Sequence, residues 1–219
     1  HLSVDLSDAA ACRTALAAWS EVTHLIYAAA CEQEGLVEGW RDPATMALNG
    51  QMFANLIDPL ADTGKLRHVS LLQGAKAYGA HVHPVSVPLR EDGPRDTHPN
   101  FYWLHEDRLR EASARSGFSF TIWRPQVLLG TAPGVAMNPV IPIGAYAAIA
   151  RERGQTFAMP GGGNAILELV DAGLLVSGGG FDLELGPAAV DRLGHAAHGF
   201  DFLDDRVERG VRDAGLRRD

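Results

Sequence analysis

Apolar residues along the chain gather in short continuous runs separated by longer stretches of helical periodicity. The runs at 22–29, 66–72 and 118–123 have the length of strands. Continuous apolar character, without an alternating polar face, is typical of parallel strands that are covered on both sides. Two further short strands are predicted at 2–6 and 156–159. The pattern therefore predicts a mainly parallel sheet.

Helical stretches lie between these runs. A first helix, capped by Ser7 or Asp8, is expected to continue through Trp19. Others are predicted at about 42–60, 101–115 and 139–153. Regular alternation of strand and helix favours an α/β fold with a Rossmann-like doubly wound parallel sheet.

Composition narrows the classes of partner. The 219 residues, 46% of them hydrophobic, suffice for one sizeable core. A formal charge of −8 argues against a nucleic-acid or anionic-membrane surface. Cys12 and Cys31 lack the spacing of a disulfide or zinc framework. No apolar run of about 18 residues predicts a membrane span, and no signal-peptide pattern opens the chain, so the cytoplasm is the simplest compartment.

Lys76 and Tyr102 are the first candidates for chemistry. Lys76 follows the predicted strand at 66–72, and Tyr102 opens the helix at 101–115. An ammonium and a phenolate about 4 Å apart in a half-buried cleft interact by roughly 4 kcal/mol, which would lower the pKa of the phenol. The pair therefore predicts proton transfer or stabilisation of an oxyanion.

Other polar residues give weaker signals. His81, His83 and His98 share a loop, but no cysteine or carboxylate set accompanies them, so we expect no metal site. The glycine runs at 161–163 and 178–180 are typical of loops rather than of phosphate cradles. Asn49 is open to two interpretations, as a surface amide or as a residue near the site.

Four ordered segments carry a family resemblance. They are Thr23–Ala29 (THLIYAA), Val69–Gly79 (VSLLQGAKAYG), Asn100–Asp107 (NFYWLHED) and Trp123–Gly130 (WRPQVLLG). Over roughly residues 1–175 the chain resembles the progesterone 5-beta-reductase and iridoid synthase-like reductases, which are atypical extended short-chain dehydrogenases/reductases.

The resemblance implies a reductase mechanism. Tyr102 and Lys76 match the catalytic pair, while Ala28, Ala29, Lys76 and Pro125 match positions beside the cofactor. In the family a reduced nicotinamide, normally NADPH or else NADH, delivers hydride to the β-carbon of an α,β-unsaturated carbonyl compound. The tyrosine hydroxyl bonds the carbonyl oxygen as it becomes an enolate. The implied partner is a small enone or another carbonyl substrate, and a homodimer is left open.

The departures from the family predict a truncated member. The first β-α-β unit, with its glycine-rich turn, would precede His1, so we expect weak binding of NADPH. We predict a partial NAD(P)-binding Rossmann-like reductase domain at 1–177 and a divergent, poorly ordered tail at 178–219. Two alternatives remain. One is a related NAD-dependent epimerase/dehydratase-type enzyme, and the other is a non-catalytic homologue without cofactor binding.

Overall fold

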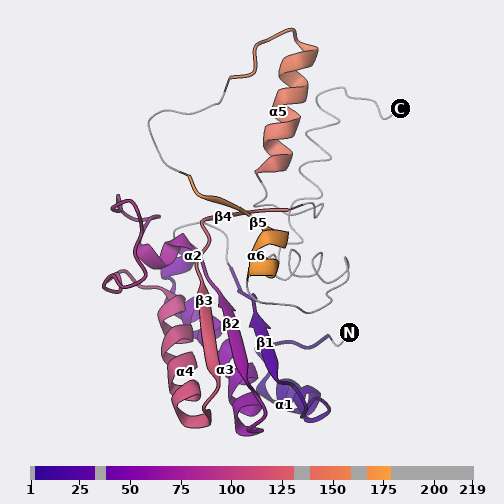
Figure 1. Ribbon diagram of the computed structural model, residues 1–219, viewed down its shortest axis with the longest axis vertical. Helices are drawn as coiled ribbons and strands as arrows, with labels where there is room; N and C mark the ends of the chain where they lie inside the picture. The colour runs from indigo at the N-terminus through magenta and orange to yellow at the C-terminus, as the bar shows by residue number, and fades with distance from the viewer. Residues whose placement is uncertain (1–2, 33–37, 131–138, 159–166, 179–219) are drawn as a thin grey trace. The chain divides into compact units, whose positions relative to one another are not determined.

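Three parallel strands form the sheet of the first unit of the chain, which spans residues 1–124. In the computed structural model β1 (His24–Tyr27) pairs with β2 (His68–Leu72), which pairs with β3 (Ser119–Trp123) (Figure 1). Its helices are α1 (Ala9–Ala17), α2 (Glu38–Arg41), α3 (Pro43–Asp62), η1, a 3-10 helix (Ala75–Tyr78), and α4 (Phe101–Ser116). The structure describes residues 3–32, 38–130, 139–158 and 167–178.

The second unit spans residues 125–219. Its described part contains a parallel pair, β4 (Val127–Leu129) with β5 (Leu169–Asp171). Two helices accompany this pair, α5 (Val140–Glu152) and α6 (Ala172–Gly178). In the described part of the chain, no helix combines the length and the apolar composition needed to cross a bilayer.

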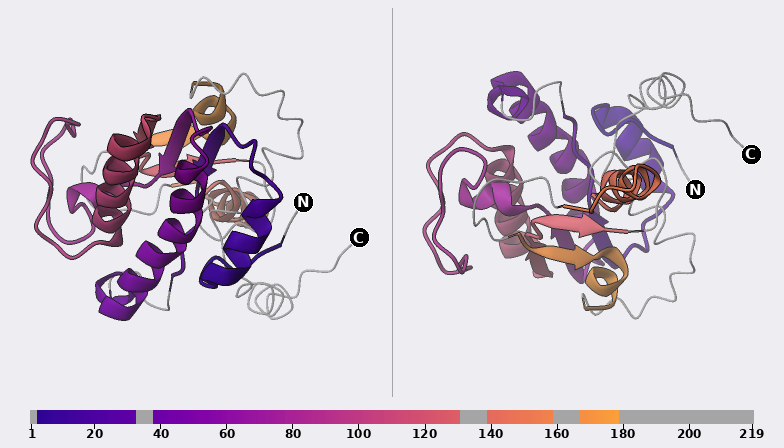
Figure 2. Two further views of the ribbon diagram at one scale, coloured as in Figure 1. Left: turned by 90° about the horizontal axis from the view of Figure 1, so that it is seen from below. Right: turned by 90° about the horizontal axis from the view of Figure 1, so that it is seen from above.

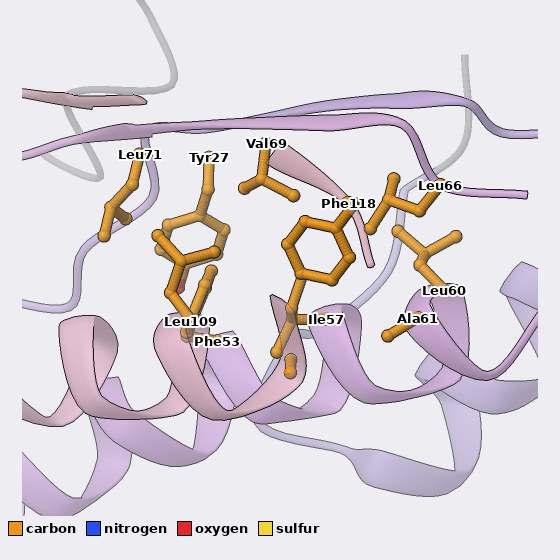
Figure 3. Packing of buried hydrophobic residues seen from close by; sticks show 11 residues of the cluster. Tyr27, Phe53, Ile57, Leu60, Ala61, Leu66, Val69, Leu71, Leu109 and Phe118 are labelled. Carbon is orange, nitrogen blue, oxygen red and sulfur yellow. The ribbon is translucent and has the colours of Figure 1, made fainter. Parts of the chain in front are cut away.

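The core of the first unit lies between the sheet and the helices on one of its faces (Figure 2). Phe53 and Ile57, one turn apart on α3, point toward Val69 and Leu71 of β2, and Leu109 of α4 joins them (Figure 3). Positions i and i+4 share one side of a helix, whereas alternate residues of a strand share one face of a sheet. One side of α3 and one face of β2 therefore pack against each other in a single layer.

Local capping fixes where the helices begin. The Asp8 carboxylate accepts hydrogen bonds from the backbone N–H groups of Ala10 and Ala11 at the start of α1. The Asp42 carboxylate accepts one from the N–H of Thr45 (2.8 Å) at the start of α3. Side-chain acceptors satisfy N–H groups that have no partner within the helix. The four long helices predicted from sequence are confirmed to within a few residues.

Two predicted strands are wrong. Residues 3–6 form no strand, because the Leu6 carbonyl accepts a hydrogen bond from Asn55 Nδ2 (2.8 Å) of α3 instead of pairing in the sheet. Residues 156–158 form none either; Phe157 is exposed there, and Gln155 N–H still donates to Ala150 at the end of α5. The short strands β4 and β5 escaped prediction because three residues carry no measurable period. The predicted tail, apart from Gly178, lies outside the described residues.

Candidate active site

The parallel sheet brings three segments to one edge. Ala28 follows β1, Gln73 follows β2 and Arg124 follows β3, and parallel strands all end on the same side. The start of α4 is tied to this edge by Asn100, whose Nδ2 donates to the backbone carbonyl of Lys76 (3.1 Å). Ligands of open α/β sheets bind outside the carboxyl ends of the strands. This edge of the first unit is therefore the candidate active site.

The structure places Lys76 and Tyr102 against the same tryptophan. Lys76 Nζ lies 3.5 Å from the centroid of the Trp40 ring, a cation–π contact. The Tyr102 ring meets Trp40 edge-on, with 5.1 Å between centroids, and Phe101 stacks on Trp40 at 4.5 Å. Trp40 itself is only 5% exposed. The buried Trp40 ring thus contacts both residues that the sequence proposes for chemistry.

Burial decides the protonation of both groups. It lowers the pKa of Lys76 to about 8, while the negative charge of Glu32 opposes that shift. Burial also raises the pKa of Tyr102 well above its ordinary value, and Glu32 adds to the increase. We expected Lys76 to lower the pKa of this phenol; instead, its removal from water raises that pKa. The Tyr102 hydroxyl therefore keeps its proton at neutral pH and is suited to donate a hydrogen bond.

Asn49 is not a surface amide, because its side chain is buried and binds the backbone of Cys31. Its Oδ1 accepts from the N–H of Cys31 (2.8 Å), and its Nδ2 donates to the Cys31 carbonyl (2.8 Å). The side chain is fully buried in α3. Asn49 therefore fixes the segment after β1 that contains Ala28 and Ala29, and Ala29 packs against the core. Pro125 is the first residue of the second unit.

A buried carboxylate lies one turn beyond Tyr102 on α4. Glu106 accepts hydrogen bonds from Arg124 Nη2 (2.5 Å), after β3, and from Arg95 Nη2 (3.3 Å) in the preceding loop. Its side chain is 3% exposed. A buried charge is tolerated only when it is paired and hydrogen-bonded. The Glu106 ion pairs therefore hold the first residue after β3 against α4.

Two of the three histidines in the loop at 80–99 form hydrogen bonds to a neighbouring carboxylate. His83 and His98 both contact the carboxylate of Asp96. His81 lies beside His98 with 4.8 Å between ring centroids, and burial lowers the pKa of His81 to about 4. Within the described ranges, no group of three potential metal ligands comes together.

Sequence reasoning missed Trp40 and Glu32. Both lie in the stretch between β1 and α3, where no apolar period marks a residue as important. Their role depends on contacts with Lys76 and Tyr102, which are distant in sequence. The one available signal was the presence of a large aromatic residue in a Gly- and Glu-rich stretch.

The depressed pKa of Lys76 predicts a pH dependence. The unfolded chain keeps this proton until about pH 10.5, whereas the folded chain loses it near pH 8. Because the unfolded state then binds more protons, the free energy of unfolding should rise between about pH 8 and pH 10.5. Denaturant unfolding of the protein and of Lys76→Met across that range checks this. Parallel pH curves for the two would contradict it.

Relatives of known sequence are similar to this chain over most of its length. An (S)-8-oxocitronellyl enol synthase of Camptotheca acuminata is 31% identical over 173 residues, covering 74% of this chain and 42% of the relative. One from Catharanthus roseus is 28% identical over 185 residues, covering 80% and 45%. A short chain dehydrogenase of Penicillium aethiopicum is 32% identical over 143 residues, covering 64% and 36%. The chain thus spans less than half the length of these relatives. No protein-family model matches it.

Solved structures share the fold. A UDP-glucose 4-epimerase matches 84% of this chain and 58% of its own, with a TM-score of 0.59 and 19% identity. The protein RMD from Pseudomonas aeruginosa, solved with NADPH, matches 80% and 58% with a TM-score of 0.57 and 19% identity. The fold is therefore that of the Rossmann-like α/β short-chain dehydrogenases/reductases. Within that class, the chain belongs to the progesterone 5-beta-reductase and iridoid synthase-like family of atypical extended members.

Proposed function

We propose that this chain carries the catalytic edge of an NAD(P)H-dependent reductase that reduces the C=C bond of an α,β-unsaturated carbonyl compound. One observation carries the proposal most directly. Lys76 and Tyr102, the residues that match the family's catalytic pair, both contact Trp40 beside the carboxyl edge of the parallel sheet. The related (S)-8-oxocitronellyl enol synthases support the reaction class.

The groups at this edge fit a nicotinamide cofactor. Lys76 Nζ contacts the Trp40 ring and is attracted by Glu32 but makes no hydrogen bond to another described residue, so it can donate to the ribose hydroxyls. Ala28 and Ala29 are small residues in the segment after β1 that Asn49 holds, and Pro125 is the second residue after β3 in sequence. NADPH, or NADH, supplies the hydride when bound. Solved structures of the same fold in complex with NADP or NADPH support this assignment.

The roles of the two residues follow from their protonation. Tyr102 retains its proton, and its hydroxyl makes no hydrogen bond to another described residue, so it can donate to the substrate carbonyl oxygen. That bond strengthens as the oxygen becomes an enolate, which lowers the barrier because the donor is already in place. Lys76 is mostly cationic at neutral pH, and its positive charge favours the same developing anion.

Product analysis tests the proposal. The protein is incubated with 2-cyclohexen-1-one and NADPH at millimolar concentration, because the first unit contains no glycine-rich turn after a described strand and we expect weak cofactor affinity. We expect NADPH oxidation that depends on the enone and yields cyclohexanone. Formation of the allylic alcohol would assign carbonyl reduction instead. In a parallel incubation with a UDP-sugar and NAD+, interconversion of the sugar without net reduction of NAD+ would assign epimerisation.

A further inference from the structure

A chain of hydrogen bonds runs from the loop at 80–99 to the candidate catalytic pair. At its outer end, His83 Nε2 lies 2.7 Å from Asp96 Oδ2 and His83 Nδ1 lies 3.1 Å from the carbonyl oxygen of Pro84. Both neighbours are acceptors, so both ring nitrogens of His83 donate and the ring is cationic. These contacts raise the pKa of His83 and hold that of Asp96 well below its ordinary value.

The middle of the chain fixes one tautomer of His98. Its Nδ1 lies 2.6 Å from Asp96 Oδ1, which also accepts the His98 backbone N–H (3.0 Å). The Asp96 carboxylate can only accept, so His98 Nδ1 carries a hydrogen. His98 Nε2 lies 3.0 Å from Asn100 Nδ2, which is a donor, so Nε2 must accept. His98 is therefore neutral, with its proton on Nδ1.

Asn100 connects this chain to both candidate catalytic residues. Its Oδ1 accepts the backbone N–H of Tyr102 (3.0 Å) as the N-cap of α4. Its Nδ2 donates to the carbonyl of Lys76 (3.1 Å) and to His98 Nε2. The acceptor and both amide hydrogens are thereby used, and the side chain is 1% exposed. With the amide flipped, the oxygen and nitrogen would exchange places, and the three neighbours could not all be satisfied.

Two residues of this hydrogen-bond network, His83 and Asp96, also pack against the end of η1, the element that carries Lys76. Gly79, with φ +75, directly follows η1. A Cβ at this position would lie 2.5 Å from His83 Nε2 and 2.6 Å from Asp96 Oδ2. The His83–Asp96 ion pair therefore packs directly against the backbone of Gly79, where a side chain would not fit. The end of η1 is thus held at two points, by Asn100 at the carbonyl of Lys76 and by the loop at the backbone of Gly79.

We propose that His98 and Asn100 are positioning residues that hold Lys76 and Tyr102 in place relative to each other, with Asp96 keeping His98 in the neutral tautomer whose Nε2 accepts from Asn100. Its consequence for turnover rests on the proposed reductase function. The positioning itself concerns contacts within the first unit, so it can be measured without any substrate.

Two substitutions of His98 each preserve only one of its two side-chain hydrogen bonds. The amide of His98→Gln extends about as far as Nε2, so it can still accept from Asn100. The amide of His98→Asn extends only about as far as Nδ1, so it keeps Asp96 and loses Asn100. A third variant, Asn100→Asp, retains a helix cap of equal quality but replaces the donor to the Lys76 carbonyl by a carboxylate oxygen.

The readout is the position of the Lys76 side chain. Lys65 and Lys76 are the two lysines of the sequence, so reductive methylation with a ¹³C label gives two lysine signals besides that of the N-terminus. Methyl groups over the face of Trp40 are shielded by the ring, whereas Lys65, which pairs with Glu21, lies over no aromatic ring in a described cation–π contact and serves as the reference. Circular dichroism confirms that each variant is folded.

We expect the Lys76 signal to stay shielded in the protein and in His98→Gln, and to move toward the Lys65 position in His98→Asn and Asn100→Asp. An unchanged Lys76 signal in both of the latter would overturn the proposal. If Asn100→Asp does not fold, the comparison of His98→Asn with His98→Gln decides by the same criterion.

Kinetics provides the second readout. His98→Asn should lower kcat for enone reduction by about 10- to 100-fold with little change in KM, because small displacements of catalytic groups affect turnover more than binding. His98→Gln should recover most of this loss. Equal kcat in the two variants would contradict a positioning role. A protein without reductase activity would refute the proposed function, while the lysine signal would still decide the positioning.

Discussion

Tyr102→Phe should lower the turnover of an enone by about 100- to 1000-fold, the loss typical for removal of one oxyanion donor. The expected effect is on kcat rather than on KM, because the bond to the carbonyl oxygen is stronger in the transition state than in the ground state. Phenylalanine preserves the aromatic contacts with Trp40 and Phe101, so folding should be little affected. Steady-state kinetics with thermal melting measures both.

The matched control for this substitution is Tyr146→Phe. Tyr146 lies on α5 of the second unit, is 38% exposed and packs against Phe157. It should leave turnover unchanged. Full activity of Tyr102→Phe would instead assign the proton donor to another group, and Lys76 would then be the first candidate, since its pKa of about 8 keeps it mostly protonated at neutral pH.

Phe53→Ala should reduce the free energy of unfolding of the first unit by about 3 to 5 kcal/mol. Phe53 has no exposed surface and meets Tyr27 edge-on with 4.8 Å between ring centroids. Its removal leaves a cavity between α3 and the sheet (Figure 3) that neighbouring side chains can fill only in part. Denaturant unfolding followed by tryptophan fluorescence reports on this unit, because all four tryptophans lie before residue 125.

Leu104→Ala is the control for the core substitution. Leu104 lies on α4 of the same unit and is 40% exposed, with contacts to Gly50. Its truncation should cost about 1 kcal/mol, since part of the side chain is already in water. Similar losses for Phe53→Ala and Leu104→Ala would show that the packed layer between α3 and the sheet does not dominate the stability of this unit.

The local pattern was sufficient for the long elements and for their order. Runs of apolar residues around Val69 and Phe120 predicted strands, and the helices at 101–116 and 140–152 were found from periodicity. Capping residues are local signals, so the sequence limited the cap of α1 to Ser7 or Asp8, and the structure shows that it is Asp8. Residues 3–6 were misread because a short apolar segment fits either a strand or a turn, and the bond from Asn55 to Leu6 arises only in the folded chain.

The sequence by itself determined the α/β class, the parallel character of the sheet and the two residues proposed for chemistry, because hydrophobic periodicity and ordered motifs are written along the chain. The tertiary structure alone decided what surrounds those residues. Trp40 contacts Lys76 across 36 positions of sequence, and burial of Tyr102 reverses the direction of the pKa shift expected from a neighbouring lysine. Both effects arise from groups distant in sequence that exclude water together, and no local pattern encodes such an arrangement.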